Sequence, residues 1–207
     1  TRVVGGLVMV HGDDAGLRLP PAVAPVQVVV LPVRGDAELV RVAEGVAEEL
    51  RGAGVRVRVD AREGRSFGRR VTEWEIKGAP LRVELGPRDL ADGQVTLARR
   101  DAGEKTATPL AGLAAVVPGL LATVQADLLA AATRRRDDRT HEVATLAEAA
   151  EAARIGFARL PWAAVGVEGE ALLAQDGVTV RCLQRPDGSL PDDPDEEDLV
   201  AVVARAY

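Results

Sequence analysis

The feature that most constrains the fold is a regular alternation of strand and helix patterns between residues 26 and 98. Residues 26–33 form an apolar run interrupted only by Gln27, which is typical of a strand buried on both faces. Residues 36–50 carry apolar side chains at helical spacing behind Asp36, a residue type that can cap a helix N-terminus. Further patterns predict a strand at 55–60, a helix at 67–77 and strands at 81–85 and 94–98. This βαβαββ order predicts an α/β fold with a mixed, mostly parallel sheet flanked by helices.

Two kinds of local signal mark the limits of these elements. Ser66 can cap the helix at 67–77, and Gly78 can stop it. Three prolines within residues 19–25 exclude a helix and predict a linker, which follows a short apolar strand expected at residues 3–10. A domain boundary is therefore expected near residue 25.

The second half of the chain predicts a long helix and then a separate small module. An Ala- and Leu-rich helix is expected from Leu113 to about Arg136. Thr145 and Glu148 match a capping box, which predicts a helix running to about Phe157. Short strand and helix signals follow, and the acidic segment PDGSLPDDPDEED reads as a loop. The expected domains are residues 1–25, 26–138 and 139–207, the last being a small α+β module.

Composition limits the class of protein. The chain has 207 residues, 47% of them hydrophobic and 28% charged, which excludes wholesale disorder. No uninterrupted apolar run approaches the roughly 20 residues that a membrane span needs, and the N-terminus has no signal-peptide pattern. A single cysteine, Cys182, cannot form an internal disulfide, and with His11 and His141 far apart a structural zinc site is not expected. These features predict a protein of a reducing compartment, the cytoplasm.

The charge is unevenly distributed. The net charge is −6, and residues 186–207 hold seven acids and one base, so the remainder of the chain is neutral. Residues 51–82 carry nine bases and four acids, a local excess of +5. Such a patch is a candidate site for a polyanion, but on charge alone a solvated surface explains it equally well.

Three segments together resemble one enzyme family. They are TRVVGGLVMVHGDDAGLRLPPAVAPVQVVVLPV, EGRSFGRRVTEWEIKGAPLRVELGPRD and the terminal VVARAY. They resemble the prolyl-tRNA synthetases of the archaeal and eukaryotic type, class IIa, from class II motif 3 to the C-terminus. The resemblance implies a class IIa anticodon-binding domain, followed by the α+β module. It also implies part of a proline--tRNA ligase, which uses ATP with Mg²⁺ to join proline to tRNA(Pro).

The resemblance carries further expectations about partners. The family implies binding of tRNA(Pro) and proline, no membrane, and a homodimer formed through the catalytic domain. This segment would read the anticodon, and because it lacks motifs 1 and 2 it would be inactive alone. The alternative is a free-standing, non-enzymatic RNA-binding or regulatory module with the same α/β fold. A flavodoxin-like small-molecule binder is a weaker option, because PVRGDAE after the first strand is not a Gly-rich phosphate loop.

The resemblance also assigns candidate site residues. Thr1 and Arg2 fall at motif 3, where the arginine packs on ATP, and His11 is a weak candidate for the substrate pocket. The positions that match the anticodon-reading region are Asp60, Arg62, Arg70, Glu73, Glu75 and Lys77. The proline anticodons end in GG, and arginine or lysine can bind the N7 and O6 acceptors of guanine while a carboxylate binds its N–H donors. A cluster of mixed sign is therefore more informative than a purely basic one.

Several of these residues also have a purely structural explanation. Trp74 could stack on an unpaired base, but a core position in the 67–77 helix is the favoured interpretation. Glu73 and Lys77 are spaced i, i+4, so a plain surface ion pair could account for both.

The C-terminal module departs from the family. Many members hold a zinc with two cysteine pairs, but here Pro161–Trp162 is followed by Ala163 and Ala164. No metal site is expected, and Cys182 is predicted to be a small buried hydrophobe.

Overall fold

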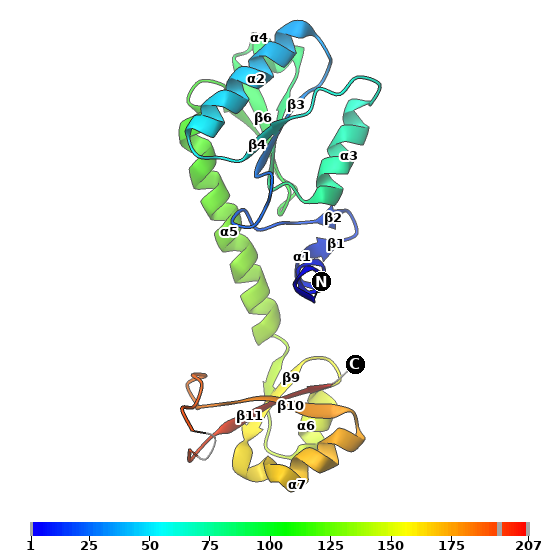
Figure 1. The fold of residues 1–207 in the computed structure, drawn as a ribbon, viewed down its shortest axis with the longest axis vertical. Coiled ribbons are helices and arrows are strands. Elements are labelled where there is room, and N and C mark those ends of the chain that lie inside the picture. Colours follow the sequence, from blue (N-terminus) through cyan, green and yellow to red (C-terminus); the bar gives the residue numbers. More distant parts are fainter. Residues whose placement is uncertain (1, 194–195, 206–207) are drawn as a thin grey trace. The chain divides into compact units, whose positions relative to one another are not determined.

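The computed structural model describes residues 2–193 and 196–205, and the chain forms two compact units, Thr1–Ala130 and Ala131–Tyr207. The first unit is built on a five-stranded sheet (Figure 1). Its strands are β3 (Val28–Pro32), β4 (Val57–Val59), β5 (Leu81–Leu85), β6 (Gln94–Arg99) and β7 (Lys105–Pro109), in the order β4-β3-β5-β6-β7. Strand β3 pairs in parallel with β4 and β5, whereas β5–β6 and β6–β7 are antiparallel. The predicted α/β fold with a mixed sheet is confirmed, but the sheet is not mostly parallel, because parallel and antiparallel pairs are equally frequent among its described strands.

Helices cover the two faces of this sheet differently (Figure 1). On one face, α2 (Ala37–Gly52) and α5 (Leu113–Asp137) pack over an apolar core that includes Val28 and Val30 of β3. On the other face lies α3 (Phe67–Lys77), with Trp74 packed against Val29 and Leu31 of the same strand. Because successive side chains of a strand point to opposite faces, the continuous apolar run of β3 supplies both cores.

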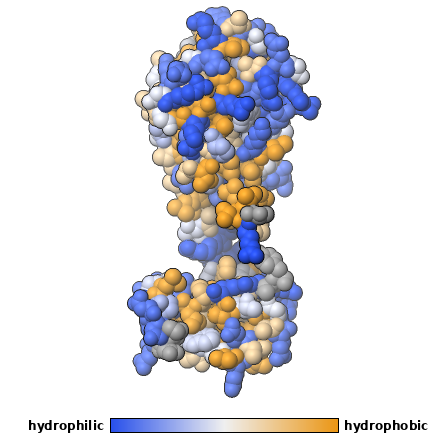
Figure 2. Space-filling model, viewed as in Figure 1, coloured by the Kyte–Doolittle hydropathy of each residue, from blue (hydrophilic) through white to orange (hydrophobic). Residues whose placement is uncertain are grey.

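The N-terminal segment differs from its prediction. Residues 3–10 are not a strand but part of a helix, α1 (Arg2–His11), none of whose described residues is buried. Figure 2 shows apolar surface over this helix. A lone strand leaves its backbone N–H and C=O groups unpaired, whereas a helix pairs them internally. None of the described sheets includes residues 3–10, and the helix satisfies their backbone groups internally. A small hairpin follows, β1 (Gly12–Asp13) and β2 (Gly16–Leu17).

Other predictions need smaller corrections. The GPRD turn is part of a short helix, α4 (Pro87–Ala91), and Asp36 flanks α2 without a side-chain capping hydrogen bond. The strand β7 escaped prediction because it is an exposed edge strand that ends in Pro109, with little apolar content. The helix opened by Thr145, α6 (Leu146–Ala152), has the predicted capping box but ends before Phe157, which begins a strand.

The second unit is a small α+β module, as predicted. Its sheet has the order β10-β11-β9-β8. The strands are β8 (Thr140–Glu142), β9 (Phe157–Pro161), β10 (Val178–Gln184) and β11 (Val200–Arg205), with α6 and α7 (Trp162–Gln175) packed on them. Cys182 is half-buried on β10 rather than fully buried. Arg185 binds Asp192 and Glu196, so part of the acidic loop is anchored by an arginine.

The helix α5 passes the length and composition test for a membrane span, contrary to the expectation of no candidate. Its buried side chains recur every three or four residues and belong to the core of the first unit: Leu113, Val117, Leu121, Val124 and Leu128. This stripe is the signature of a core helix with one face on a sheet.

Candidate functional site

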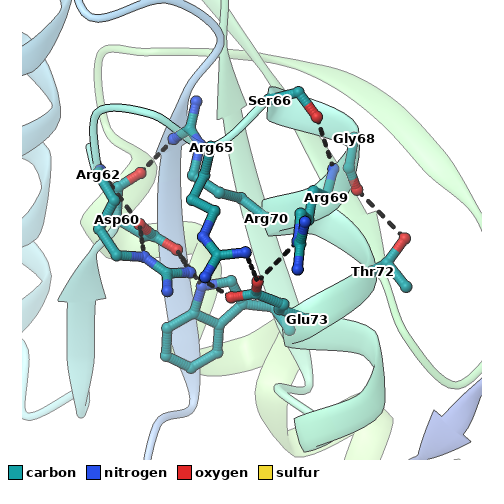
Figure 3. Close-up of polar contacts among 10 residues, drawn as sticks. Asp60, Arg62, Arg65, Ser66, Gly68, Arg69, Arg70, Thr72 and Glu73 are labelled. Atoms are coloured by element: carbon teal, nitrogen blue, oxygen red, sulfur yellow. Dashed lines mark hydrogen bonds and ion pairs between the residues drawn. The ribbon is translucent and has the colours of Figure 1, made fainter.

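Four of the polar residues predicted at positions 60–77 gather where β4 ends beside α3: Asp60, Arg62, Arg70 and Glu73 (Figure 3). Asp60 directly follows β4, and its N–H donates to the carbonyl of Val30 (2.9 Å), which ties it to β3. The helix α3 has the predicted limits. The Ser66 side chain accepts a hydrogen bond from the Arg69 N–H (3.3 Å), and Gly78 ends the helix with φ of 76°. Local capping signals therefore fix which α3 side chains face the end of β4.

Asp60 is the buried anion of the cluster, with 3% of its surface exposed. Its two carboxylate oxygens accept from Nε and Nη2 of Arg62, both at 2.8 Å, and Oδ2 also accepts from Nε1 of Trp74 at 2.7 Å. Burial raises the pKa of this carboxyl, but the hydrogen bonds from Arg62 and Trp74 outweigh it and lower the pKa to about 2. Asp60 is thus fully engaged in holding Arg62 and Trp74.

Glu73 is the accessible carboxylate, and it is surrounded by arginines. Its Oε2 accepts from Nη2 of Arg62 at 2.6 Å, while Oε1 lies 3.8 Å from Nη1 of Arg65 and 3.6 Å from Nε of Arg69. The hydrogen bond from Arg62 lowers the pKa of Glu73, and Arg65 and Arg69 act in the same direction. The side chains of Arg62, Arg65 and Arg69 are exposed to solvent by two-fifths or more. This surface can offer cationic donors around one carboxylate.

Arg70, although predicted with the exposed candidates, is buried. It donates from Nη1 to the carbonyl of Asp60 and from Nη2 to the carbonyl of Pro32 (2.8 Å), and it lies 5.9 Å from the centre of the Phe67 ring. Arg70 therefore joins the carboxyl ends of the parallel strands β3 and β4 and holds them against α3.

Trp74 and Lys77 form the third part of the cluster. Trp74 is 5% exposed, which confirms its predicted core position. Nζ of Lys77 lies 4.7 Å from the centre of the Trp74 ring, a cation–π arrangement. The alternative ion pair between Glu73 and Lys77 is not formed among the described residues, because each side chain has other partners.

Glu75 faces a different set of charges, which the sequence analysis missed. Its Oε1 forms an ion pair with Nη1 of Arg82 at 3.0 Å, Nε of Arg82 lies 3.4 Å from Glu84, and Nζ of Lys105 lies 2.8 Å from Glu84. Acid and base thus alternate from α3 across β5 to β7. The available signal was the alternation in LRVEL, which places Arg82 and Glu84 on one face of the strand.

The N-terminal candidates lie apart from this cluster in the chain, before the hairpin that contacts α3. Arg2 is exposed at the start of α1, His11 ends α1, and Thr1 lies outside the described residues. The following hairpin is fixed by Asp13, which accepts from Nη1 of Arg100 at 3.0 Å.

The same hairpin also packs closely against the end of α3. A Cβ added at Gly16 would lie 2.4 Å from Cα of Ile76, so only glycine fits there. The described residues contain no group of three or more His, Cys, Asp or Glu side chains arranged to hold a metal ion.

Comparisons with known proteins show what this chain is similar to. The anticodon binding domain family matches residues 27–120, which include the whole cluster. A proline--tRNA ligase of Frankia casuarinae is 61% identical over all of this chain and 44% of its own length. The chloroplastic/mitochondrial proline--tRNA ligase of Arabidopsis thaliana is 38% identical over all of this chain and 41% of its own length.

A solved structure agrees as well. Prolyl-tRNA synthetase from Cryptosporidium parvum, complexed with L-proline and AMP, matches all of this chain and 46% of its own, with a TM-score of 0.86 and 30% identity. The chain spans less than half the length of the relatives it matches.

Proposed function

We propose that this chain, a homologue of the prolyl-tRNA synthetases along its whole length and the bearer of an anticodon-binding domain, reads the anticodon of tRNA(Pro). The observation that carries the proposal is the cluster of mixed sign on α3, where Glu73 lies among three exposed arginines. Guanine presents both acceptors and donors, so a surface that offers guanidinium groups beside a carboxylate is suited to it.

The residues of the cluster would have different roles in anticodon recognition. Arg62 and Glu73 are exposed enough to meet a base, and Lys77 lies at the other end of the same helix face. Asp60 and Arg70 are buried, so they would position other groups rather than contact the base. Asp60 would hold the Arg62 side chain in place, and Arg70 would hold the ends of β3 and β4. Glu75 would act together with Arg82, which binds it.

The relatives support a proposal for the wider activity of the whole enzyme. The enzyme would join proline to tRNA(Pro) with ATP and Mg²⁺, in the cytoplasm and as a homodimer formed through its catalytic domain. The relatives are more than twice as long as this chain, and ATP, Mg²⁺ and proline would bind chiefly to the part that it does not span. Thr1 and Arg2 would contribute to the ATP site, and His11 would lie near the substrate pocket. This chain alone would catalyse no proline-dependent pyrophosphate exchange.

The test is discrimination between anticodons. Binding of the chain to tRNA(Pro) and to the same tRNA with its GG altered would be measured by fluorescence anisotropy. Arg62→Ala or Glu73→Gln should reduce the preference for the cognate tRNA by about 1–3 kcal/mol, because each removes one partner of guanine. Glu44→Ala is the matched control, because Glu44 is an exposed glutamate on α2, which covers the opposite face of the sheet. Equal weakening of cognate and altered tRNA by Arg62→Ala and Glu73→Gln would show that the cluster only attracts phosphate.

A further inference from the structure

A second, smaller site adjoins the cluster at the start of α3. Two loops, residues 33–35 after β3 and residues 61–66 after β4, enclose a pocket of about 280 Å³ with Phe67 and Arg70. We propose that this pocket binds one phosphate group of the RNA backbone. The proposal rests on the proposed function and deepens it, since it supplies a contact that positions the RNA beside the base-reading cluster.

The lining of the pocket is strongly cationic. It contains Arg34, Arg62, Arg65 and Arg70 but only one acid, Glu63. Arg62 and Arg65 also bind Glu73, so they link the pocket to the base-reading cluster. Arg34 is exposed, and no partner for its guanidinium is found among the described residues. Arginine presents a planar fork of donors that matches phosphate oxygens, so Arg34 is the natural first contact.

The backbone at the pocket adds donors to this charge. The helix α3 is eleven residues long, and its first N–H groups have no acceptor within the helix. Ser66 satisfies the N–H of Arg69, which leaves those of Phe67 and Gly68 for an external acceptor. A Cβ added at Gly35, Gly64 or Gly68 would meet nothing within 4 Å, so an anion can approach the backbone there. The positive end of the helix dipole favours such a ligand.

An independent observation comes from Arg70, which is 4% exposed. Its two Nη atoms bind the strand-end carbonyls, but its Nε is buried and has no hydrogen-bond partner among the described residues. Buried donors are normally paired, so an unpaired one marks a place where an anion or an ordered water is expected. Arg70 lines the pocket, so a phosphate bound there would lie beside this incompletely paired guanidinium.

The size of the pocket is compatible with this ligand. Its volume of about 280 Å³ admits a phosphate group, and the cavity lies at the small end for ligand sites. Its lining offers a phosphate charge and donors, with Phe67 as the one aromatic ring. Contacts of this kind fix the register of a nucleic acid without reading its sequence.

The first test uses Arg34→Ala, because Arg34 is exposed and contributes to none of the base-reading contacts. Binding to the anticodon stem-loop of tRNA(Pro) would be measured between 50 and 200 mM salt, with thermal melting to verify the fold. Loss of one phosphate contact should weaken binding about threefold to fivefold, equally for cognate and altered anticodons, and lower the salt slope by about 0.7. Arg41→Ala, at an exposed arginine on α2, is the matched control and should change neither quantity.

The second test locates the phosphate. Each phosphate of the anticodon loop would be replaced in turn by an uncharged methylphosphonate. One replacement should weaken binding to the unaltered chain more than it weakens binding to Arg34→Ala, because Arg34→Ala has already lost one partner of that phosphate. An unchanged salt slope in Arg34→Ala, or a loss that depends on the anticodon, would overturn the proposal.

Two further results separate this site from its neighbours. If inorganic phosphate stabilises the unaltered chain but the stem-loop does not bind, the assignment to RNA is wrong; binding of neither probe also overturns the proposal. If the methylphosphonate effect is present while Glu73→Gln leaves anticodon preference intact, the phosphate site stands and the base-reading role fails.

Discussion

The two faces of the five-stranded sheet are built on different principles. The face under α2 and α5 is a continuous apolar core. The face under α3 has only a small apolar cluster around Trp74, and it carries buried charges. Among the described residues, five charged side chains are buried: Asp60, Arg70, Arg82, Glu84 and Arg100. Each belongs to α3, bonds to it, or bonds to a residue that does.

We infer that this difference separates stability from the proposed function within one domain. Buried ion pairs contribute little net stability, because desolvation offsets their attraction, whereas apolar burial is the main source of folding free energy. The α2–α5 face is therefore expected to hold the fold together. The α3 face is expected to fix a defined arrangement of charges. The loss of stability that this arrangement causes is offset by apolar burial on the other face.

The largest expected effect breaks the apolar face. Leu81→Ala removes a fully buried side chain from the core under α2 and α5, and it should lower the free energy of unfolding by about 2–5 kcal/mol. Denaturant unfolding would measure this loss. Anticodon preference should be unchanged under conditions where the variant is folded, and a change in that preference would show that the two faces are not separable.

A smaller effect is expected on the α3 face. Trp74→Phe keeps the aromatic ring in the core but removes the hydrogen bond from Nε1 to the buried Asp60. Loss of one bond to a buried charge should lower the free energy of unfolding by about 1.5–3 kcal/mol. Anticodon preference should fall as well, because Asp60 also holds Arg62. If Trp74→Phe proves as stable as the unaltered chain, the hydrogen bond between Trp74 and Asp60 does not stabilise the fold.

The third prediction concerns the pH dependence of stability that the buried Asp60 gives to the α3 face. The pKa of Asp60 is lowered from 3.8 to about 2 in the folded chain, so the stabilisation is complete above the unfolded pKa and is lost as pH falls through about 2. This contribution is on the order of 2 kcal/mol. The unfolding free energy of the unaltered chain should fall between pH 4 and 2 more steeply than that of Asp60→Asn. Parallel pH profiles for the two proteins would contradict the lowered pKa of Asp60 in the folded chain.

Much of the fold was predictable because its signals are local. The limits of α3 follow from Ser66 and Gly78, and β5 was predicted at its observed bounds. The failures have an equally clear cause. Residues 3–10 were read as a strand from their apolar content, but a strand needs a partner, and pairing is not a local property. The edge strand β7 is held by its pairing with β6 rather than by its own sequence.

The candidate site was predictable only in part. The resemblance singled out residues 60–77, and the structure brings Asp60, Arg62, Glu73 and Trp74 into one hydrogen-bonded group. Sequence could not tell the exposed Arg62 from the buried Arg70, since both are arginines in the same basic stretch. It also missed Arg82, Glu84 and Lys105, because their contacts join β5 and β7 to α3.

The sequence by itself determined the α/β class, the limits of α3 and the stretch in which the mixed charges lie, because spacing and capping act between near neighbours in the chain. Only the tertiary structure decided which charges are buried, which are exposed, and that four arginines from two loops and a helix line one pocket. Burial and charge pairing depend on contacts between residues distant in sequence. These contacts exist only when the parallel strands β3 and β4 bring their carboxyl ends together beside α3.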